Sequence, residues 1–182
     1  LTRVVCSGYQ STPPFVVWAS QPGWFQKMNA PWYRDFKAEE LPTLTTPEGV
    51  AVTVIAGESH GVAGAVAREA TAPTYLDIHM PQGTDFAQPL AAGHNVFVYV
   101  YRGAVTIGDQ TVPQQRMAIL KNDAGSDGVV VAATQDARLL LIAGQPLKEP
   151  IAQYGPFVMN TNEEVFQAVR DFQDGKLGEV AA

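Results

Sequence analysis

Cysteine and basic residues are scarce in this sequence. A single cysteine, Cys6, stands among 182 residues, and 12 lysines and arginines face 18 acidic residues, which gives a formal net charge of −6. A lone cysteine excludes both an internal disulfide and a zinc site with several cysteine ligands, and we interpret Cys6 as a small buried apolar residue. Because clusters of lysine and arginine are needed to neutralise phosphates, we expect no direct nucleic-acid binding.

Long apolar runs are missing as well. No run approaches the ~18 residues that a membrane-spanning helix needs. The stretch after Arg3 is interrupted by Gly8 and by Pro13–Pro14, so it lacks the continuous apolar region of a signal peptide. We therefore expect a cytoplasmic protein with no membrane segment. Apolar residues nonetheless make up 46% of the chain and charged residues 16%, which is enough for a folded core.

The first 48 residues are rich in proline and aromatic residues. Trp18, Trp24 and Trp32 lie among these prolines, and only Phe15–Trp18 has the composition of a short strand. Such a segment makes a poor independent core. We predict that residues 1–48 form an arm or linker that lies on another surface.

From Gly49 onward the chain has the pattern of an all-β domain, which we place at residues 49–155. Turn-forming residues separate short β-rich runs, and from Asn95 on these begin at intervals of roughly 8–12 residues, the spacing of an antiparallel barrel or jelly roll. Asn95–Tyr101 is apolar on both faces and is predicted to be central and covered on both sides. The β-rich runs are Val50–Ile55, Thr74–Met80, Asn95–Tyr101, Ala104–Ile107, Met117–Leu120, Gly128–Ala132 and Ala137–Ile142.

A helix is predicted in the last segment, residues 156–182. Thr161 and Glu164 have the spacing of a capping box, and Gly175 supplies a stop signal. Between these signals, apolar residues recur at helical spacing and form one stripe. The members of this apolar stripe are Val165, Phe166, Val169 and Phe172.

Several segments resemble the pirin family, in the order in which that family has them. Gly155–Gly178 (GPFVMNTNEEVFQAVRDFQDGKLG) is similar to the C-terminal end of pirins. Further similar segments are Leu141–Pro150 (LIAGQPLKEP), Tyr75–Asp77 (YLD) and Val54–Gly61 (VIAGESHG), and Lys27–Asp35 (KMNAPWYRD) with Glu40–Pro42 (ELP) resembles the linker between two pirin halves. The resemblance extends from about Phe15 to Gly178.

This resemblance implies that the chain is the C-terminal half of a bicupin, together with the interdomain linker. Pirins consist of two stacked β-barrels, and the resemblance implies one iron site, made of three histidines and one glutamate, in the N-terminal barrel. Some members are quercetin dioxygenases and others are transcriptional cofactors. The sequence motifs of the N-terminal, metal-binding half are absent from this sequence, so iron is expected only in that half.

The second barrel lacks metal ligands where a cupin motif would place them. A cupin metal site needs two histidines spaced by one residue, then a glutamate, and a third histidine on a distant strand. Counted from Gly83 to Gly103, the first set falls near Pro89, Ala91 and Val96, and the distant histidine falls near Val129–Val131. None of these side chains binds metal, so we predict a degenerate, metal-less cupin barrel with a packed interior.

The three histidines do not share a recognisable spacing either. His94 precedes a strand and is interpreted as a turn or surface residue, and His79 is placed on a polar outer face with Asp77. His60 follows Glu58 in a glycine-flanked loop, and that pair is the remaining candidate for metal binding or acid–base chemistry. We assign no catalytic residue and no metal ligand.

Three functions are compatible with this sequence. The first is a scaffold or protein-interaction module whose apolar stripe, Val165, Phe166, Val169 and Phe172, binds a second copy of the chain or an N-terminal pirin half. The second is part of a quercetin 2,3-dioxygenase-type oxidoreductase whose iron site lies in the other half. The third is a small-molecule binding module that uses an apolar barrel mouth.

Overall fold

The chain divides into two compact units in its computed structural model. The structure describes residues 15–16, 35–67, 71–123 and 125–176. One unit comprises residues 39–146, and the other comprises residues 1–38 together with 147–182. Cys6, Trp18, Trp24 and Trp32 lie outside the described residues.

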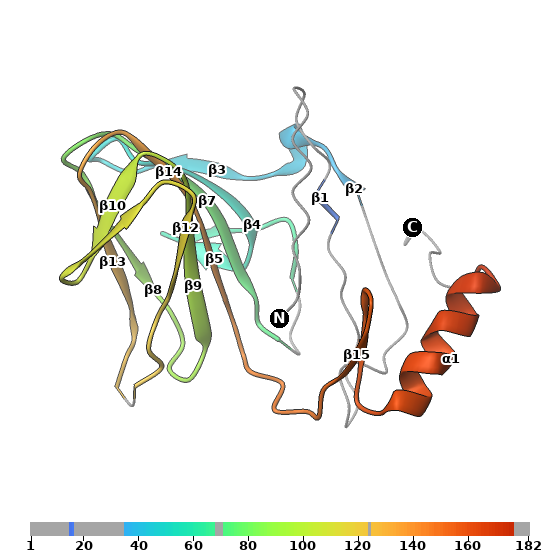
Figure 1. Cartoon of the computed structure of the whole chain (residues 1–182). Helices are drawn as coiled ribbons and strands as arrows, with labels where there is room; N and C mark the ends of the chain where they lie inside the picture. The colour runs from blue at the N-terminus through green and yellow to red at the C-terminus, as the bar shows by residue number, and fades with distance from the viewer. Residues whose placement is uncertain (1–14, 17–34, 68–70, 124, 177–182) are drawn as a thin grey trace. The chain divides into compact units, whose positions relative to one another are not determined.

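An antiparallel sheet of six strands forms one side of the larger unit (Figure 1). Its order is β12-β9-β14-β7-β4-β3. Of the paired strands in this sheet, β3 and β4 are consecutive in the chain, whereas the other pairs have further strands between them in the sequence. β3 lies within the segment that the sequence assigned to the arm, yet it pairs with β4. The strands are β3 (Thr43–Thr45), β4 (Ala51–Ala56), β7 (Thr74–Met80), β9 (Asn95–Arg102), β12 (Arg116–Ile119) and β14 (Ala137–Gly144).

A second antiparallel sheet, of four strands, faces the first (Figure 1). Its order is β11-β10-β13-β8. These strands are β8 (Asp85–Pro89), β10 (Ala104–Ile107), β11 (Gln110–Pro113) and β13 (Gly128–Ala133). A short hairpin, β5 (Glu58–Ser59) with β6 (Val62–Ala63), follows β4.

The core lies between these two sheets and is built by alternation along each strand. The six-stranded sheet contributes fully buried side chains such as Leu139 and Val98, and the four-stranded sheet contributes Phe86, Val105 and Val131. Burying each side chain of this kind stabilises the fold by about 1.5–3 kcal/mol relative to leaving it in water. The outer face of the six-stranded sheet is thereby left to carry the polar residues.

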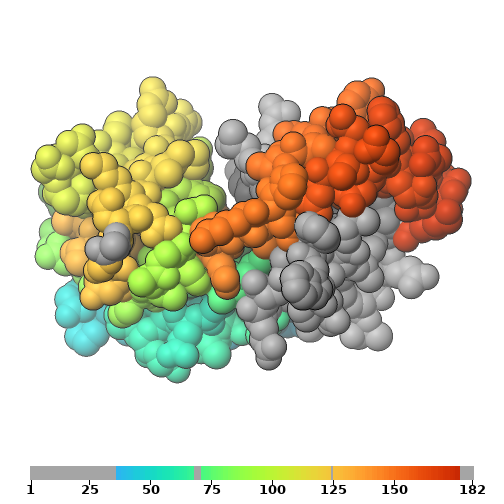
Figure 2. Space-filling model, turned by 90° about the horizontal axis from the view of Figure 1, so that it is seen from below, coloured from blue at the N-terminus to red at the C-terminus, as the bar shows by residue number. Residues whose placement is uncertain are grey.

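The smaller unit contains a hairpin and the C-terminal helix. β15 (Ala152–Tyr154) pairs with β16 (Phe157–Met159), and α1 spans Asn162–Gln173. Figure 2 shows the helix in red beside the hairpin in orange. This unit also includes β1 (Phe15–Val16), which pairs with β2 (Asp35–Phe36). A short 3-10 turn at Ala38–Glu40 connects to the larger unit.

The helix begins and ends where the sequence predicts. The Thr161 side chain accepts a hydrogen bond from the Glu164 backbone N–H, and the Glu164 carboxylate accepts one from the backbone N–H of Thr161, which completes a capping box. Gly175 follows the cap with φ of +71°, a conformation that glycine adopts without strain. None of the described helices is long and apolar enough to cross a bilayer.

The predicted fold class is confirmed: the chain is mainly antiparallel β with a C-terminal helix. The prediction that Asn95–Tyr101 is covered on both sides was wrong. β9 does lie inside the sheet, and Val98 and Val100 are fully buried, but Phe97 and Tyr99 on its other face are only partly buried. A sheet that packs against one other sheet covers one face, and apolar residues on the second face do not change that.

Candidate functional site

The described interior positions of the larger unit are mainly apolar. Pro89 and Ala91, which the cupin spacing placed in the barrel, are exposed, and the residues of β8 that point inward are Phe86 and Gln88. Val129 and Val131, near the predicted position of the distant cupin histidine, are buried in the core, as expected for apolar side chains. Among the described residues, no group of three or more histidine, cysteine, aspartate or glutamate side chains could hold a metal ion. The described interior residues therefore supply no ligand set for iron, and the pirin resemblance implies iron only in the other half.

Gln88 is the polar exception in this apolar interior. Its side chain is 4% exposed, and its Nε2 donates to the carbonyl oxygens of Glu58 at 3.1 Å and Pro89 at 3.0 Å. Its Oε1 is buried and accepts no hydrogen bond from the described part of the chain. The two donated bonds fix the amide against the β5 hairpin.

The weak candidate pair of Glu58 and His60 is not assembled as a pair in this structure. His60 Nδ1 lies 2.9 Å from the buried Ser59 hydroxyl, and its ring centroid lies 5.3 Å from that of Phe86. Glu58 contributes its backbone carbonyl to Gln88, while its side chain is exposed. The imidazole of His60 is therefore positioned by a hydroxyl and a phenyl ring.

His94 lies at the turn before β9, as predicted, but part of its ring is enclosed. Its backbone N–H donates to the carbonyl of Ala91 at 3.2 Å. Its Nδ1 is buried and has no hydrogen-bond partner among the described residues. Because no described residue bonds to this nitrogen, the structure gives His94 no acid–base or metal-binding partner there.

A hydrogen-bonded group on the outer face of the six-stranded sheet contains the remaining histidine. The Tyr101 hydroxyl donates to Asp77 Oδ1 at 2.8 Å and lies 3.0 Å from His79 Nε2. His79 Nε2 is itself 3.6 Å from Asp77 Oδ1. Sequence alternation correctly placed Asp77 and His79 together on the outer face of β7 but missed Tyr101.

Tyr101 enters this group through an irregularity in strand pairing. Arg138 of β14 is opposite Arg102 of β9, whereas the next residue, Leu139, is opposite Val100, so Tyr101 is an extra residue in the ladder. Burial, and next the negative charge of Asp77, raise the pKa of Tyr101. The tyrosine therefore stays protonated and acts as a hydrogen-bond donor in this network.

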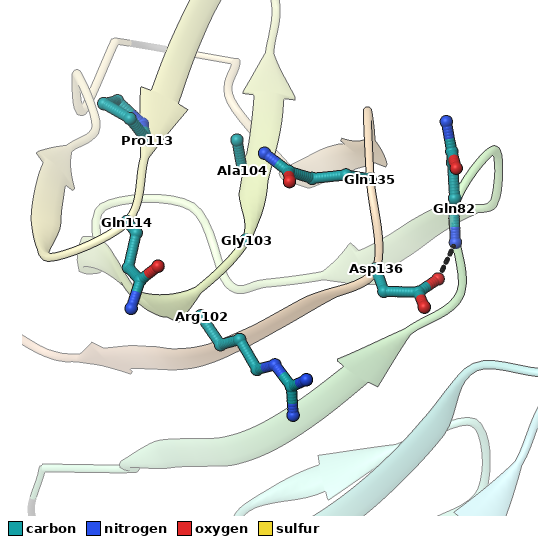
Figure 3. A pocket seen from close by; sticks show the side chains of 8 residues that line it. All are labelled: Gln82, Arg102, Gly103, Ala104, Pro113, Gln114, Gln135 and Asp136. Carbon is teal, nitrogen blue, oxygen red and sulfur yellow. Dashed lines mark hydrogen bonds between the residues drawn. The ribbon is translucent and has the colours of Figure 1, made fainter.

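Two adjoining hollows border this network at the end of the sheet. The larger, of about 600 Å³, is lined by residues that include Arg102, Gly103, Gln114 and Asp136 (Figure 3). The smaller, of about 310 Å³, is lined by His79, Arg138 and again Arg102 and Asp136, among others. Figure 3 shows the Asp136 carboxylate turned toward Gln82, whose backbone N–H donates to it at 2.8 Å.

The apolar stripe of α1 is divided between an inner and an outer side. Val165 is 2% exposed and Val169 is partly buried, so these two pack within the unit. Phe166 and Phe172 are 58% and 62% exposed. The Phe172 ring makes an edge contact with Phe157 of β16, with centroids 5.9 Å apart, and otherwise projects outward. The stripe residues named as a partner surface thus differ sharply in accessibility.

Comparison with known proteins identifies the family. The sequence profile of the Pirin C-terminal cupin domain matches residues 75–178. Mouse pirin is 41% identical over 160 residues, which cover 84% of this chain and 53% of the mouse protein. The pirin-like protein of Caulobacter vibrioides is 38% identical over 164 residues, which cover 90% of this chain and 58% of the Caulobacter protein. The crystal structure of quercetin 2,3-dioxygenase from Acinetobacter baumannii superposes with a TM-score of 0.73 at 33% identity, covering 85% of this chain and 53% of that one. The chain spans about half the length of the curated relatives it matches.

Proposed function

Because this chain belongs to the pirin family, we propose that it is a cupin half without a metal site of its own, which docks against a metal-binding cupin half. The observation that carries this proposal is the exposed side of α1, with Phe166 and Phe172. The apolar interior of the larger unit supports a scaffold role, because its inward positions are occupied by core side chains.

The choice of partner follows from chain length and from the helix itself. The relatives are nearly twice as long as the segment matched here, so each contains a second half of similar size. A capped helix that leaves two phenylalanine rings more than half exposed has an apolar surface of the kind that interfaces cover. Aromatic residues also contribute disproportionately to binding at interfaces. We therefore assign the outer side of α1 to that second half, supplied in the same or another chain.

Replacing the two exposed rings tests this assignment. The variant Phe166→Ser/Phe172→Ser should remain folded, because exposed side chains contribute little to stability, whereas Val165→Ala should destabilise the unit by about 1–2 kcal/mol. The probe is the segment of the Caulobacter pirin-like protein that this chain does not match, mixed with the chain in sedimentation velocity. We expect the wild type to form a complex and the double variant to lose it.

Ile119→Ser is the matched control, because Ile119 is 76% exposed but lies on β12 in the larger unit. It should bind like the wild type. Self-association of the wild type that the double variant abolishes would identify a second copy as the occupant instead. A chain that binds neither itself nor the probe, or a double variant that binds unchanged, contradicts the docking proposal.

A role as the non-catalytic half of a quercetin 2,3-dioxygenase-type oxidoreductase is the second candidate. It is favoured by the similarity to the Acinetobacter enzyme. On this proposal the purified chain holds no stoichiometric iron and consumes no oxygen with quercetin and added ferrous iron. Elemental analysis and an oxygen electrode check both statements. One metal per chain that is lost on replacing His60, His79 or His94 would contradict the assignment of all metal ligands to the other half.

A further inference from the structure

Three cationic or potentially cationic side chains are aligned across neighbouring strands of the six-stranded sheet. His79 of β7 is the direct cross-strand partner of Arg138 of β14, and Arg138 is in turn the direct partner of Arg102 of β9. Direct partners in an antiparallel pair lie on the same face of the sheet. All three line the smaller hollow, so their side chains share one open space on the surface.

The positive charges of Arg102 and Arg138 are not balanced by a negative charge of a described residue beside them. Like charges directly opposite each other destabilise a sheet. No carboxylate of the described residues lies within 4.0 Å of either guanidinium, and neither guanidinium donates a hydrogen bond to a described residue. The chain has more acidic than basic residues, with a net charge of −6. The two arginines therefore lack carboxylate partners among the described residues because of their position and not because the chain has few acidic residues.

Two acidic residues on this part of the surface, Asp136 and Asp77, already accept hydrogen bonds from other groups. Asp136 lines both hollows, but its Oδ1 accepts the backbone N–H of Gln82, and its carboxylate points toward that residue in Figure 3. Asp77 accepts the hydroxyl of Tyr101. The guanidinium groups together have ten N–H donors, and none is used within the described part of the chain. An oxygen-rich anion would use these donors and remove the repulsion between the two positive charges.

We propose that Arg102 and Arg138, beside His79, form a binding site for a phosphate group, carried by a small molecule that occupies the adjoining hollows. Guanidinium forks match the geometry of phosphate oxygens and bind them bidentately. The neighbouring side-chain amides of Gln82, Gln114 and Gln135, which line the larger hollow, provide neutral donors and acceptors for the rest of such a ligand. The site is on the opposite side of the sheet from the core and does not depend on metal.

The test uses the full chain, with inorganic phosphate as the probe and chloride at equal ionic strength as the reference. Amide chemical shifts are followed by NMR at about pH 8, where inorganic phosphate is mainly a dianion, as a phosphate monoester is. We expect saturable shifts confined to the strand ends around Gly103, Asp136 and Arg138. Acetate, which has a single charge and two oxygens, should bind distinctly more weakly.

Two variants and one control decide the outcome. Arg138→Gln should weaken phosphate binding at least about fivefold, and Arg102→Gln/Arg138→Gln should abolish saturation. Arg170→Gln on α1 removes the same charge elsewhere and should bind like the wild type. Phosphate should also raise the melting temperature of the wild type and not that of the double variant, because a ligand that binds only the folded state stabilises it.

Several results would overturn the proposal. These are shifts that do not saturate, equal binding of acetate and phosphate, or unchanged binding by the double variant. If Arg102→Gln/Arg138→Gln does not fold, Arg138→Lys retains the charge and loses the planar fork, and it should still bind phosphate more weakly than the wild type. Equal affinity of Arg138→Lys and wild type would show that bidentate recognition is wrong.

Discussion

Tyr101→Phe is expected to change the pH dependence of stability in a way that reports on the outer-face network. The substitution removes the hydroxyl that donates to Asp77 at 2.8 Å and contacts His79 at 3.0 Å, and it leaves the ring in place. A hydrogen bond to a charged group contributes about 1.5–3 kcal/mol when well buried. Because Tyr101 is partly exposed, we expect a loss of about 1 kcal/mol near neutral pH.

At alkaline pH the difference between the two proteins should shrink and then reverse. Burial and the charge of Asp77 raise the pKa of Tyr101 in the folded state, whereas an unfolded tyrosine titrates near pH 10. Above about pH 10 the unfolded chain releases this proton and the folded chain retains it, so stability falls as pH rises toward the folded pKa. The slope from this single proton is at most about 1.4 kcal/mol per pH unit. Tyr101→Phe has no such proton and escapes this loss.

Urea unfolding of both proteins from neutral pH to about pH 11 measures this difference directly. Tyr154→Phe is the matched control, because the Tyr154 side chain is 66% exposed and lies on β15. Its stability should run parallel to that of the wild type over the whole range. Parallel curves for wild type and Tyr101→Phe would mean that the hydroxyl is not held by Asp77, and the network would then be refuted.

Three further substitutions test the local geometry. Gly103→Ala should destabilise the larger unit by at least about 2 kcal/mol in urea unfolding, because Gly103 has φ of +74° and an added Cβ would collide with the Asp136 carbonyl oxygen. Gly108→Ala, with φ of +60° but open space around it, should cost only about 1 kcal/mol, and equal costs would refute the clash. Thr161→Ala removes the side chain that accepts the Glu164 backbone N–H and should destabilise α1 by about 1 kcal/mol. The helical circular dichroism should then be lost on milder heating than in the wild type. An unchanged melting curve would show that the cap is not stabilising.

Local signals in the sequence were sufficient for the helix and for part of the sheet. The cap at Thr161, the partner at Glu164 and the stop at Gly175 are short-range features, and the helix begins and ends accordingly. β7 was predicted with its observed bounds, because its apolar residues alternate with polar ones. β8 was missed, since Asp85–Pro89 contains one large apolar side chain, Phe86, and ends in proline.

The outer-face groups could not be predicted in the same way, because they depend on pairing between distant strands. Tyr101 reaches Asp77 through the register shift between β14 and β9, and a one-residue shift changes which face each side chain occupies. Arg102 and Arg138 are separated by 36 positions in the sequence and become neighbours only through that same pairing. No periodicity within a single strand contains this information.

The orientation of β7 and β8 explains why the interior and the surface differ so strongly in chemistry. β7 turns Leu76, Ile78 and Met80 inward, and its carboxylate and imidazole, on Asp77 and His79, outward. The spacing of the cupin motif predicted that Pro89 and Ala91 point into the barrel, but both are exposed. Histidines placed at those two positions would therefore point to solvent, and the core would still have no ligand set. The charged side chains of these strands lie on the outer face of the sheet, where we propose that Arg102 and Arg138 bind phosphate.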